Sequence, residues 1–421
     1  MQSVAPARAC GVDFGTSNST VGHLCPGRGD MLTLEKDHPS LPSAVFFNVD
    51  ENSTHFGRDA MAQYLEGYEG RLVRSLKSLL GSNLMDAYTE IGGRALSFRH
   101  LLETFIGELK RRAEQSAGRS FDCAVLGRPV FFVDGKPEAD RLAEETLAQI
   151  ARSVGFREVS FQYEPIGAAL HYERELNREE LVLVADIGGG TADFSLLRLS
   201  PERARQSERK DDLLGNGGVH IGGTDFDRAL NLASAMPLLG LGSKTQSGAE
   251  LPSRLFHQLA TWHTIPLAYS RAAWADFQQI YRMSAERERL DRLSRLIDRQ
   301  AGHWLANRVE ETKIALSSSA ETRMELEELW PGLDCVVSRE LFAQASAELV
   351  ESVGQTVTEL LAQAGIDRET IDTLFFTGGG SGVPQLRAHI AALVPTARIY
   401  QGDLFGSIGA GLAVEAARRY G

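Results

Sequence analysis

The fold of this chain is decided by Gly11-Val-Asp-Phe-Gly-Thr-Ser-Asn-Ser-Thr-Val21 and by its near copy, Val184-Ala-Asp-Ile-Gly-Gly-Gly-Thr-Ala-Asp-Phe194. Each stretch begins with an apolar strand, places an aspartate near the strand end and turns through glycine into Thr or Ser. Glycine lets the backbone N–H groups of such a hairpin approach a ligand closely. The repetition predicts a duplicated fold that holds a polyphosphate and its metal ion from two sides.

Side chains around the two turns support the same interpretation. Asp13 and Asp186 stand at the bases of the hairpins, where carboxylate oxygens suit a hydrated Mg²⁺. Thr16, Ser17 and Thr191 add hydroxyl donors. Two ordinary glycine hairpins are the alternative, but an aspartate at the same place in both favours a phosphate site. The chain has no G-x-x-x-x-G-K-[ST] P-loop, and neither hairpin is a G-x-G-x-x-G that opens a helix, which excludes those two phosphate grips.

Composition limits the class of protein. The chain has 421 residues, of which 43% are hydrophobic and 24% charged, as in soluble globular proteins of two or three domains. Its net charge of −12 disfavours nucleic-acid and anionic-membrane partners, since both need a positive field. No apolar run approaches the roughly 18 residues of a membrane span. We therefore expect neither a nucleic-acid partner nor a membrane.

Cysteine usage and the N-terminus indicate the cytoplasm. Cys10, Cys25, Cys123 and Cys335 show no metal-like or C-x-x-C spacing. Cys10 and Cys123 lie in apolar runs and are interpreted as buried free thiols, which suit a reducing compartment. The segment 1–8 lacks the apolar core of a signal peptide.

Periodicity predicts alternating strands and helices. Apolar runs predict strands over 44–48, 123–126, 159–163 and 373–377. Helical spacing predicts helices over 72–80, 101–115, about 138–154, from Glu164, from Pro384 and over 404–419, with 230–318 largely helical. Charge alternation predicts a solvated helix with one buried face over 281–313, an exposed hairpin loop is expected over 200–218, and 236–253 is expected to be irregular.

A third glycine turn, Gly378-Gly-Gly-Ser-Gly-Val-Pro384, follows the predicted strand 373–377 and precedes a helix. An ordinary strand–helix turn is the alternative. After two phosphate hairpins, however, a turn without side chains favours close contact with a base or a ribose.

With these motifs, the chain resembles the ATPase portion of the DnaK-type seventy-kilodalton heat-shock chaperones, in the actin and sugar-kinase superfamily. The matches run in the family's order from residue 11 to about 415, and the likeness is greatest to the YegD-type members. The two phosphate motifs resemble Gly11–Val21 and Asp186–Leu196, and the adenosine motif resembles Thr377–Pro384. Further matches are Glu164-Pro-Ile-Gly-Ala-Ala169, Gly222-Gly-Thr-Asp-Phe-Asp227 and Lys313-Ile-Ala-Leu-Ser-Ser-Ser319.

The resemblance implies an α/β, actin-like ATPase fold, which is a duplicated ribonuclease H-like fold with two lobes around a nucleotide cleft. Lobe I would comprise residues 1–182 and lobe II residues 183–400, and residues 401–421 would form a C-terminal helix that returns to lobe I. Because the chain stops at Gly421, no peptide-binding domain is expected.

The resemblance also implies roles for individual residues. Lys77 would neutralise charge on the transferred phosphoryl group, Glu164 would orient the attacking water, and Asp193 would lie near the metal or a monovalent ion such as K⁺. Asp13 and Asp186 would hold Mg²⁺ through waters. The implied catalytic residues are Lys77, Glu164, Asp13, Asp186 and Thr191. The implied nucleotide-binding residues are Gly15, Thr16, Ser17, Asn18, Gly188, Gly189, Gly190, Thr191, Gly222, Gly223, Glu310, Lys313, Ser317, Gly378, Gly379, Gly380 and Asp403.

The chain departs from the family at the base-binding positions. Two arginines that flank the adenine in the full chaperones are replaced by Ile314 and Gly382. This predicts weaker and less selective base binding, because cation–π contacts are worth roughly 0.5–2 kcal/mol each. The family's switch proline resembles Pro129, and Arg141 is a shifted candidate for its relay arginine.

The function implied is that of an ATP-binding, slowly ATP-hydrolysing chaperone-like switch with ATP or ADP and Mg²⁺ as ligands. A protein client or co-chaperone would be its partner. Two alternatives stay open. A non-catalytic nucleotide-sensing scaffold or filament former would keep the binding residues without useful turnover. A small-molecule kinase of the same superfold would need an aspartate base facing an acceptor hydroxyl.

Overall fold

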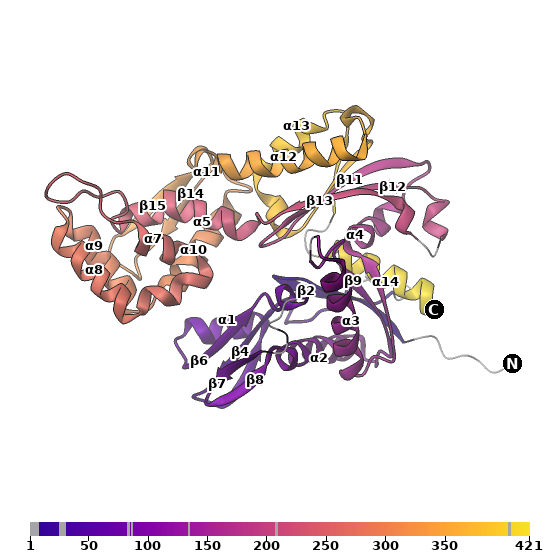
Figure 1. The fold of residues 1–421 in the computed structure, drawn as a ribbon, viewed down its shortest axis with the longest axis horizontal. Coiled ribbons are helices and arrows are strands. Elements are labelled where there is room, and N and C mark those ends of the chain that lie inside the picture. Colours follow the sequence, from indigo (N-terminus) through magenta and orange to yellow (C-terminus); the bar gives the residue numbers. More distant parts are fainter. Residues whose placement is uncertain are drawn as a thin grey trace. The chain divides into compact units, whose positions relative to one another are not determined.

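The computed structural model describes residues 8–24, 31–81, 85, 87–133, 135–206, 209–402 and 406–421. The chain divides into two compact units (Figure 1). Unit 1 contains residues 1–218, 357–381 and 394–421, and unit 2 contains residues 219–356 and 382–393. Both glycine hairpins therefore lie in unit 1. The expected boundary at 182/183 falls inside this unit, and the division into two lobes stays a prediction.

The first large sheet of unit 1 has the strand order β10-β9-β1-β2-β3. β1 and β2 form an antiparallel hairpin, and β1 and β10 each run parallel to β9. One face packs on α2 and α3, for example with the rings of Phe14 and Phe105 5.8 Å apart. The bounds are β1 Ala9–Phe14, β2 Asn18–Gly22, β3 Ser40–Pro42, β9 Cys123–Arg128, β10 Glu158–Tyr163, α2 Phe98–Ala117 and α3 Pro137–Ser153.

The second large sheet repeats this arrangement. Its order is β13-β12-β11-β16-β17; β11 and β12 are antiparallel, and β16 runs parallel to both β11 and β17. Helix α4 covers one face, where Ile166 and Tyr172 pack with Val184 and Phe375. An antiparallel hairpin followed by two parallel strands thus occurs twice, which confirms the predicted duplication. The bounds are β11 Glu180–Ile187, β12 Ala192–Leu199, β13 Leu213–Val219, β16 Thr373–Thr377, β17 Arg398–Gln401, α4 Glu164–Glu173 and α12 Ala347–Ala364.

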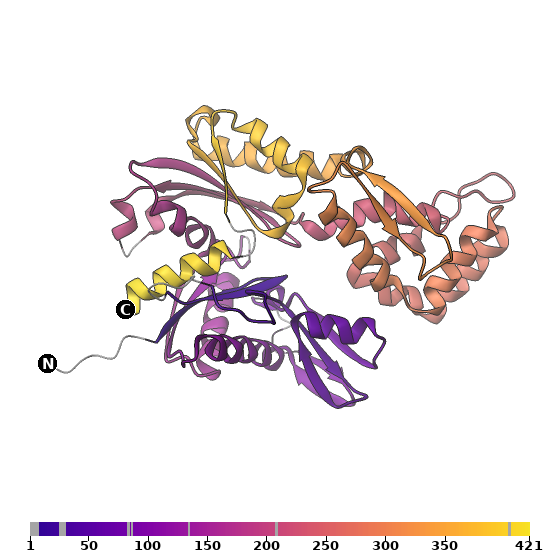
Figure 2. The same ribbon diagram turned by 180° about the vertical axis from the view of Figure 1, so that it is seen from behind.

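Helix α14 (Ser407–Tyr420) lies against the other face of the first sheet and crosses α4 (Figures 1 and 2). The contacts are made backbone to backbone. A Cβ atom at Gly411 would lie 1.7 Å from the carbonyl oxygen of Gly167, and one at Gly11 would lie 2.2 Å from the carbonyl carbon of Leu412. Side chains at these positions would separate α14 from both β1 and α4.

A smaller three-stranded sheet, β5-β4-β6, corrects one sequence-based prediction. Residues 72–80, predicted to be helical, form the end of β6 and a 3₁₀ turn, η1. Leu72 lies opposite Phe46 of β4, so pairing with a distant strand overrides the local helical pattern. The remaining bounds of this region are β4 Ala44–Asn48, β5 Ser53–Phe56, β6 Gly70–Arg74, η1 Leu76–Leu79, β7 Tyr88–Ile91, β8 Arg94–Ser97 and α1 Gly57–Leu65.

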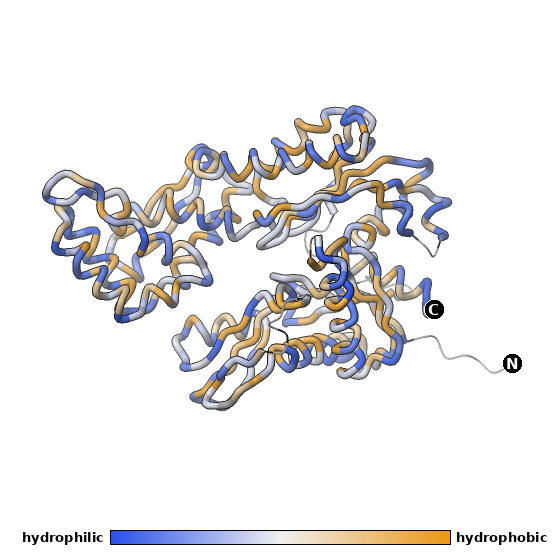
Figure 3. Tube along the Cα trace, in the orientation of Figure 1, coloured by the Kyte–Doolittle hydropathy of each residue, from blue (hydrophilic) through white to orange (hydrophobic). Residues whose placement is uncertain are grey.

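Unit 2 is mainly helical, with one β-hairpin, and hydrophobic and hydrophilic residues alternate along its helices (Figure 3). The single helix expected over 281–313 is divided among the end of α8, all of α9 and most of α10. The last two are separated near Gln300, where φ is 50°. No helix in the described part of the chain is long and apolar enough to cross a membrane. The bounds are α5 Gly223–Ala233, α6 Ala235–Leu238, α7 Arg254–Ala260, α8 Arg271–Met283, α9 Arg287–Asp298, α10 Gly302–Ala315, α11 Arg339–Ala345, α13 Pro384–Leu393, β14 Glu321–Glu325 and β15 Asp334–Ser338.

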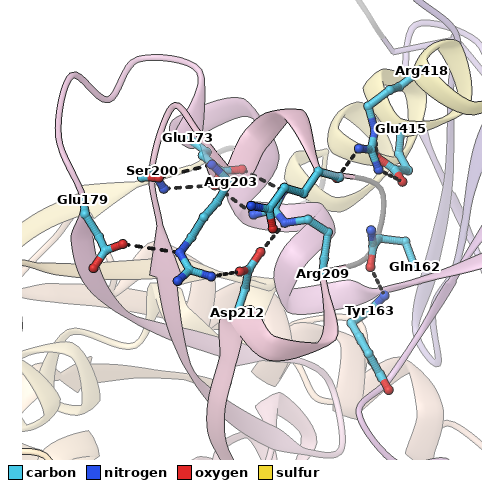
Figure 4. Close-up of polar contacts among 11 residues, drawn as sticks. Gln162, Tyr163, Glu173, Glu179, Ser200, Arg203, Arg209, Asp212, Glu415 and Arg418 are labelled. Carbon is cyan, nitrogen blue, oxygen red and sulfur yellow. Dashed lines mark hydrogen bonds and ion pairs between the residues drawn. The ribbon is translucent and has the colours of Figure 1, made fainter.

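The segment 200–218 also differs from its prediction as an exposed hairpin loop. Its last residues form strand β13, and Arg209 and Asp212 are buried. Glu173, at the end of α4, accepts hydrogen bonds from Arg209 (Figure 4). A carboxylate from another element therefore draws this charged loop into the interior of unit 1, which the local sequence does not reveal.

Candidate functional site

The turn of the first glycine hairpin is fixed by hydrogen bonds from Ser43, a residue that the sequence analysis did not select. The buried Ser43 donates from Oγ to the carbonyl of Gly15 at 2.7 Å, and its N–H donates to the carbonyl of Ser17 at 2.8 Å. A Cβ atom at Gly15 would lie 2.1 Å from the carbonyl oxygen of Asn18, so this turn requires glycine. Thr16, Ser17 and Asn18 are only half-buried, and polar atoms of the turn can reach a ligand.

The second hairpin lies next to the first within unit 1. Gly188 N–H donates to the carbonyl of Thr191 at 2.8 Å, and Thr191 Oγ1 donates to Asp193 at 2.8 Å. A Cβ atom at Gly189 would lie 2.1 Å from Ser17 Oγ. The two turns predicted to hold phosphate therefore approach each other at Gly189 and Ser17.

Lys77 and Glu164 form a buried ion pair. Lys77 Nζ lies 2.5 Å from Glu164 Oε1, and the two side chains are 10% and 11% exposed. Lys77 comes from η1, and Glu164 is the first residue of α4, whose start is favoured by the following proline. Gly127 leaves room for the acid, because a Cβ there would lie 3.1 Å from Glu164 Cγ. Residues 87 positions apart are thus brought together.

Carboxylates outnumber ammonium groups around this pair. Burial, and then the charge of Glu164, raise the pKa of Asp13 to about 7, although Lys77 opposes the rise. Burial followed by the charges of Asp193, Glu164 and Asp13 raises the pKa of Asp186. Burial lowers the pKa of Lys77, but the negative charges of Glu164 and Asp13 outweigh it and raise this pKa. The site therefore favours the binding of an additional cation.

A hydrated Mg²⁺ fits this donor set. Among the described residues, no three His, Cys, Asp or Glu side chains form a group that could bind a metal directly. Mg²⁺ commonly keeps several waters and contacts only one or two carboxylates. Asp13 and Asp186, one at each hairpin, could hold such an ion through water. Asp193 is exposed and bonded to Thr191.

The third glycine turn contacts the second hairpin. Gly378 has φ 78°, and a Cβ there would lie 2.4 Å from the Ile187 carbonyl oxygen and 2.6 Å from Asp186 Oδ1. A Cβ at Gly380 would meet Ile187 and the Gly188 carbonyl oxygen. Gly378 and Gly380 are therefore needed for packing on the end of β11, beside the Asp186 carboxylate.

The predicted nucleotide-binding residues of unit 2 are Gly222, Gly223, Glu310, Lys313 and Ser317. Gly223 and Lys313 come together there. Lys313 Nζ pairs with Asp227 at 2.8 Å and donates to the Gly223 carbonyl at 3.2 Å. Glu310 and Ser317 are exposed on and just after α10. Gly222 is buried at the start of α5. The two positions of the base-binding prediction also lie in unit 2, where Ile314 is 59% exposed and Gly382 is half-buried. Asp403 lies outside the described residues.

Arg128 lies next to Pro129, the residue that resembles the family's switch proline, and the sequence analysis did not select it. Its guanidinium donates to the carbonyl of Pro129, pairs with Asp140 at 2.8 Å and also pairs with Glu144. Arg141, the candidate drawn from the resemblance, is exposed on α3. In the sequence, Arg128 could have been selected only by its position immediately before Pro129.

Comparison with known proteins identifies related chains. A family model described as "Hsp70 protein" matches residues 87–234 and 279–403. A protein named chaperone protein HscA homolog, from Actinobacillus pleuropneumoniae, is 26% identical over 412 residues and covers 92% of this chain. Proteins named chaperone protein DnaK, from Halobacterium salinarum and Thermosipho melanesiensis, are each 25% identical and cover 93% and 97% of it. The matches take up 55%, 52% and 58% of these relatives, so the chain spans about half of their length.

Proposed function

Because this chain belongs to the Hsp70 family and is homologous to the nucleotide-binding part of DnaK and HscA chaperones, we propose that it is a slow, Mg²⁺-dependent ATPase. One observation carries the proposal. The buried Lys77–Glu164 pair lies in electrostatic contact with Asp13 and Asp186, which stand at the bases of the two glycine hairpins. A protein catalyses phosphoryl transfer mainly by stabilising charge and by positioning the reacting groups.

The roles of the residues follow from their chemistry. Backbone N–H groups of the two hairpins and the hydroxyls of Thr16, Ser17 and Thr191 hold the phosphates. Lys77 donates to phosphoryl oxygens and offsets the charge that accumulates there. Glu164 orients the attacking water and accepts its proton. Asp13 and Asp186 would hold Mg²⁺ through its waters, and the bound ion would supply further neutralisation of phosphate charge.

As a switch, the protein would differ in conformation with ATP and with ADP, and a protein client or co-chaperone would read the difference. These partners are proposed from the relatives and do not follow from the site itself. The cytoplasm is the proposed location. Its support is that Cys10, Cys123 and Cys335 are free thiols among the described residues.

Single-turnover hydrolysis of ATP tests the proposal. We expect Lys77→Ala and Glu164→Ala each to lower the rate roughly 10²-fold, as for a lost charge-stabilising or acid–base group. Binding of Mg·ATP, measured by calorimetry, should persist because backbone groups make most of the phosphate grip. Asp186→Ala should instead abolish the part of nucleotide affinity that depends on Mg²⁺.

Lys110→Ala is the matched control. Lys110 forms a similar ion pair with Glu114 at 2.6 Å, is 13% exposed and also lies in unit 1, but on α2. Its loss should leave hydrolysis unchanged. Wild-type rates in folded Lys77→Ala and Glu164→Ala proteins would show that the pair takes no part in the chemistry.

A further inference from the structure

The C-terminal end of α4 carries a buried ion pair with two parallel hydrogen bonds. Arg209 Nη2 donates to Glu173 Oε1 at 2.8 Å, and Arg209 Nη1 donates to Glu173 Oε2 at 3.0 Å (Figure 4). The Glu173 and Arg209 side chains are 0% and 2% exposed. Bidentate guanidinium–carboxylate pairs fix orientation as well as distance. The last residue of α4 is therefore held in one geometry against the connection between β12 and β13.

This pair, which we term the α4 anchor, lies in a larger network of charges with Asp212, Arg203 and the more exposed Glu179. Asp212 accepts hydrogen bonds from Arg209 Nε and, at 2.5 Å, from Arg203 Nη1. Ser200 N–H donates to Glu173 Oε1 at 3.2 Å. Removal of one member of the Glu173–Arg209 pair would leave the other charge buried without its partner, which is strongly destabilising.

The same connection also contacts α14. Arg418 Nη1 donates to the carbonyl of Gln206, while its other nitrogens pair with the buried Glu415 (Figure 4). Helix α14 in turn packs on β1 through Gly11 and on α4 through Gly411. Arg209 and Gln206, both from this connection, thus contact the C-terminal ends of α4 and α14, the two helices that pack together beside β1.

We propose that the α4 anchor positions Glu164, and that Glu173 and Arg209 are positioning residues for the hydrolysis proposed above, on which this inference rests. Glu164 and Glu173 are the first and last residues of one ten-residue helix. Such a helix is about 15 Å long, so a tilt of about 5° at the anchored end moves the other end by about 1.3 Å. A displacement of about 1 Å can cost 10²-fold in rate.

The double variant Glu173→Leu with Arg209→Met tests the inference, because it replaces the buried pair without leaving either charge behind. Asp212 keeps its ion pair with Arg203. We expect the single-turnover rate at saturating Mg·ATP to fall at least tenfold while the Kd of Mg·ATP stays within threefold. A purely structural role would lower the melting temperature and leave the rate of the folded protein unchanged.

The matched control is Arg203→Met, which removes a neighbouring arginine outside the α4 anchor that is bonded to Asp212 and Glu179 and not to Glu173. It should leave the rate within twofold of wild type. If the double variant does not fold, Glu173→Asp provides a milder test, because it keeps the charge and shortens the side chain by one methylene. A rate within twofold of wild type in the double variant would overturn the inference. If the double variant does not fold, the same result in Glu173→Asp would overturn it.

Hydrogen exchange separates this inference from the proposed function. Backbone amides of residues 163–170 should exchange at least fivefold faster in the double variant than in wild type and Arg203→Met. If the double variant does not fold, Glu173→Asp takes its place in this comparison. If wild type does not hydrolyse ATP, the proposed function fails, and exchange alone decides the inference. Unchanged exchange over these residues would then show that the anchor does not position the start of α4.

Discussion

Replacing Asp13 by Asn should stabilise the ligand-free protein above neutral pH. The pKa of the Asp13 carboxyl is raised from 3.8 to about 7, first by burial and then by the charge of Glu164. The folded protein therefore keeps this proton up to about pH 7, whereas the unfolded chain releases it near pH 4. Folding takes up a proton between these values, so the contribution of Asp13 to stability is present below pH 4 and is lost as pH rises through 7.

The magnitude follows from the size of the shift. About three pKa units at 1.36 kcal/mol each correspond to at most about 4 kcal/mol of unfolding free energy. Asn cannot ionise and has nearly the shape of the protonated acid. Without Mg²⁺ and nucleotide, Asp13→Asn should therefore match wild type near pH 4 and exceed its stability by up to about 4 kcal/mol at pH 8.

Urea unfolding followed by far-ultraviolet circular dichroism is a suitable assay. Tryptophan fluorescence is less suitable, because Trp262, Trp274, Trp304 and Trp330 all lie in unit 2 and Asp13 lies in unit 1. The exposed Asp37 supplies the control, Asp37→Asn, which should leave the pH dependence of stability unchanged. Equal pH dependence in wild type and Asp13→Asn between pH 4 and 8 would refute the reasoning.

Two further predictions concern packing and base recognition. Gly411→Ala should destabilise the protein by more than about 2 kcal/mol, because its Cβ would collide with the backbone of Gly167. Gly107→Ala on α2 is the control, since a Cβ there has no atom nearer than 3.6 Å. It should be neutral or stabilising by about 0.5–1 kcal/mol. Urea unfolding of both variants measures the difference, and equal effects would argue against close packing of α14 on α4. Ile314→Arg with Gly382→Arg should tighten ATP binding at least fivefold relative to GTP in calorimetry, since a Cβ at Gly382 meets nothing within 4 Å and its φ is not in the left-handed region. Nanomolar and ATP-selective binding by wild type would contradict this prediction.

The local sequence determined the two hairpins and most of the elements beside them. A glycine turn between apolar runs restricts the backbone within a few residues, and the predicted strands at 44–48, 159–163 and 373–377 are confirmed as β4, β10 and β16 within one residue. The predicted helices over 101–115 and about 138–154 are confirmed as α2 and α3. They could be predicted because the apolar spacing that indicates a helix lies within the helix itself. The duplicated topology followed from the repetition of one motif.

Only the tertiary structure decided where charged side chains are buried. Lys77 lies on a 3₁₀ turn because Leu72, five residues earlier, pairs across a sheet with Phe46, and its ammonium is buried only because Glu164 lies 2.5 Å away. Arg209 likewise enters the interior because Glu173 accepts its two hydrogen bonds. A buried charge needs a partner. Each of these partners comes from a distant part of the chain, which no local pattern of residues can specify.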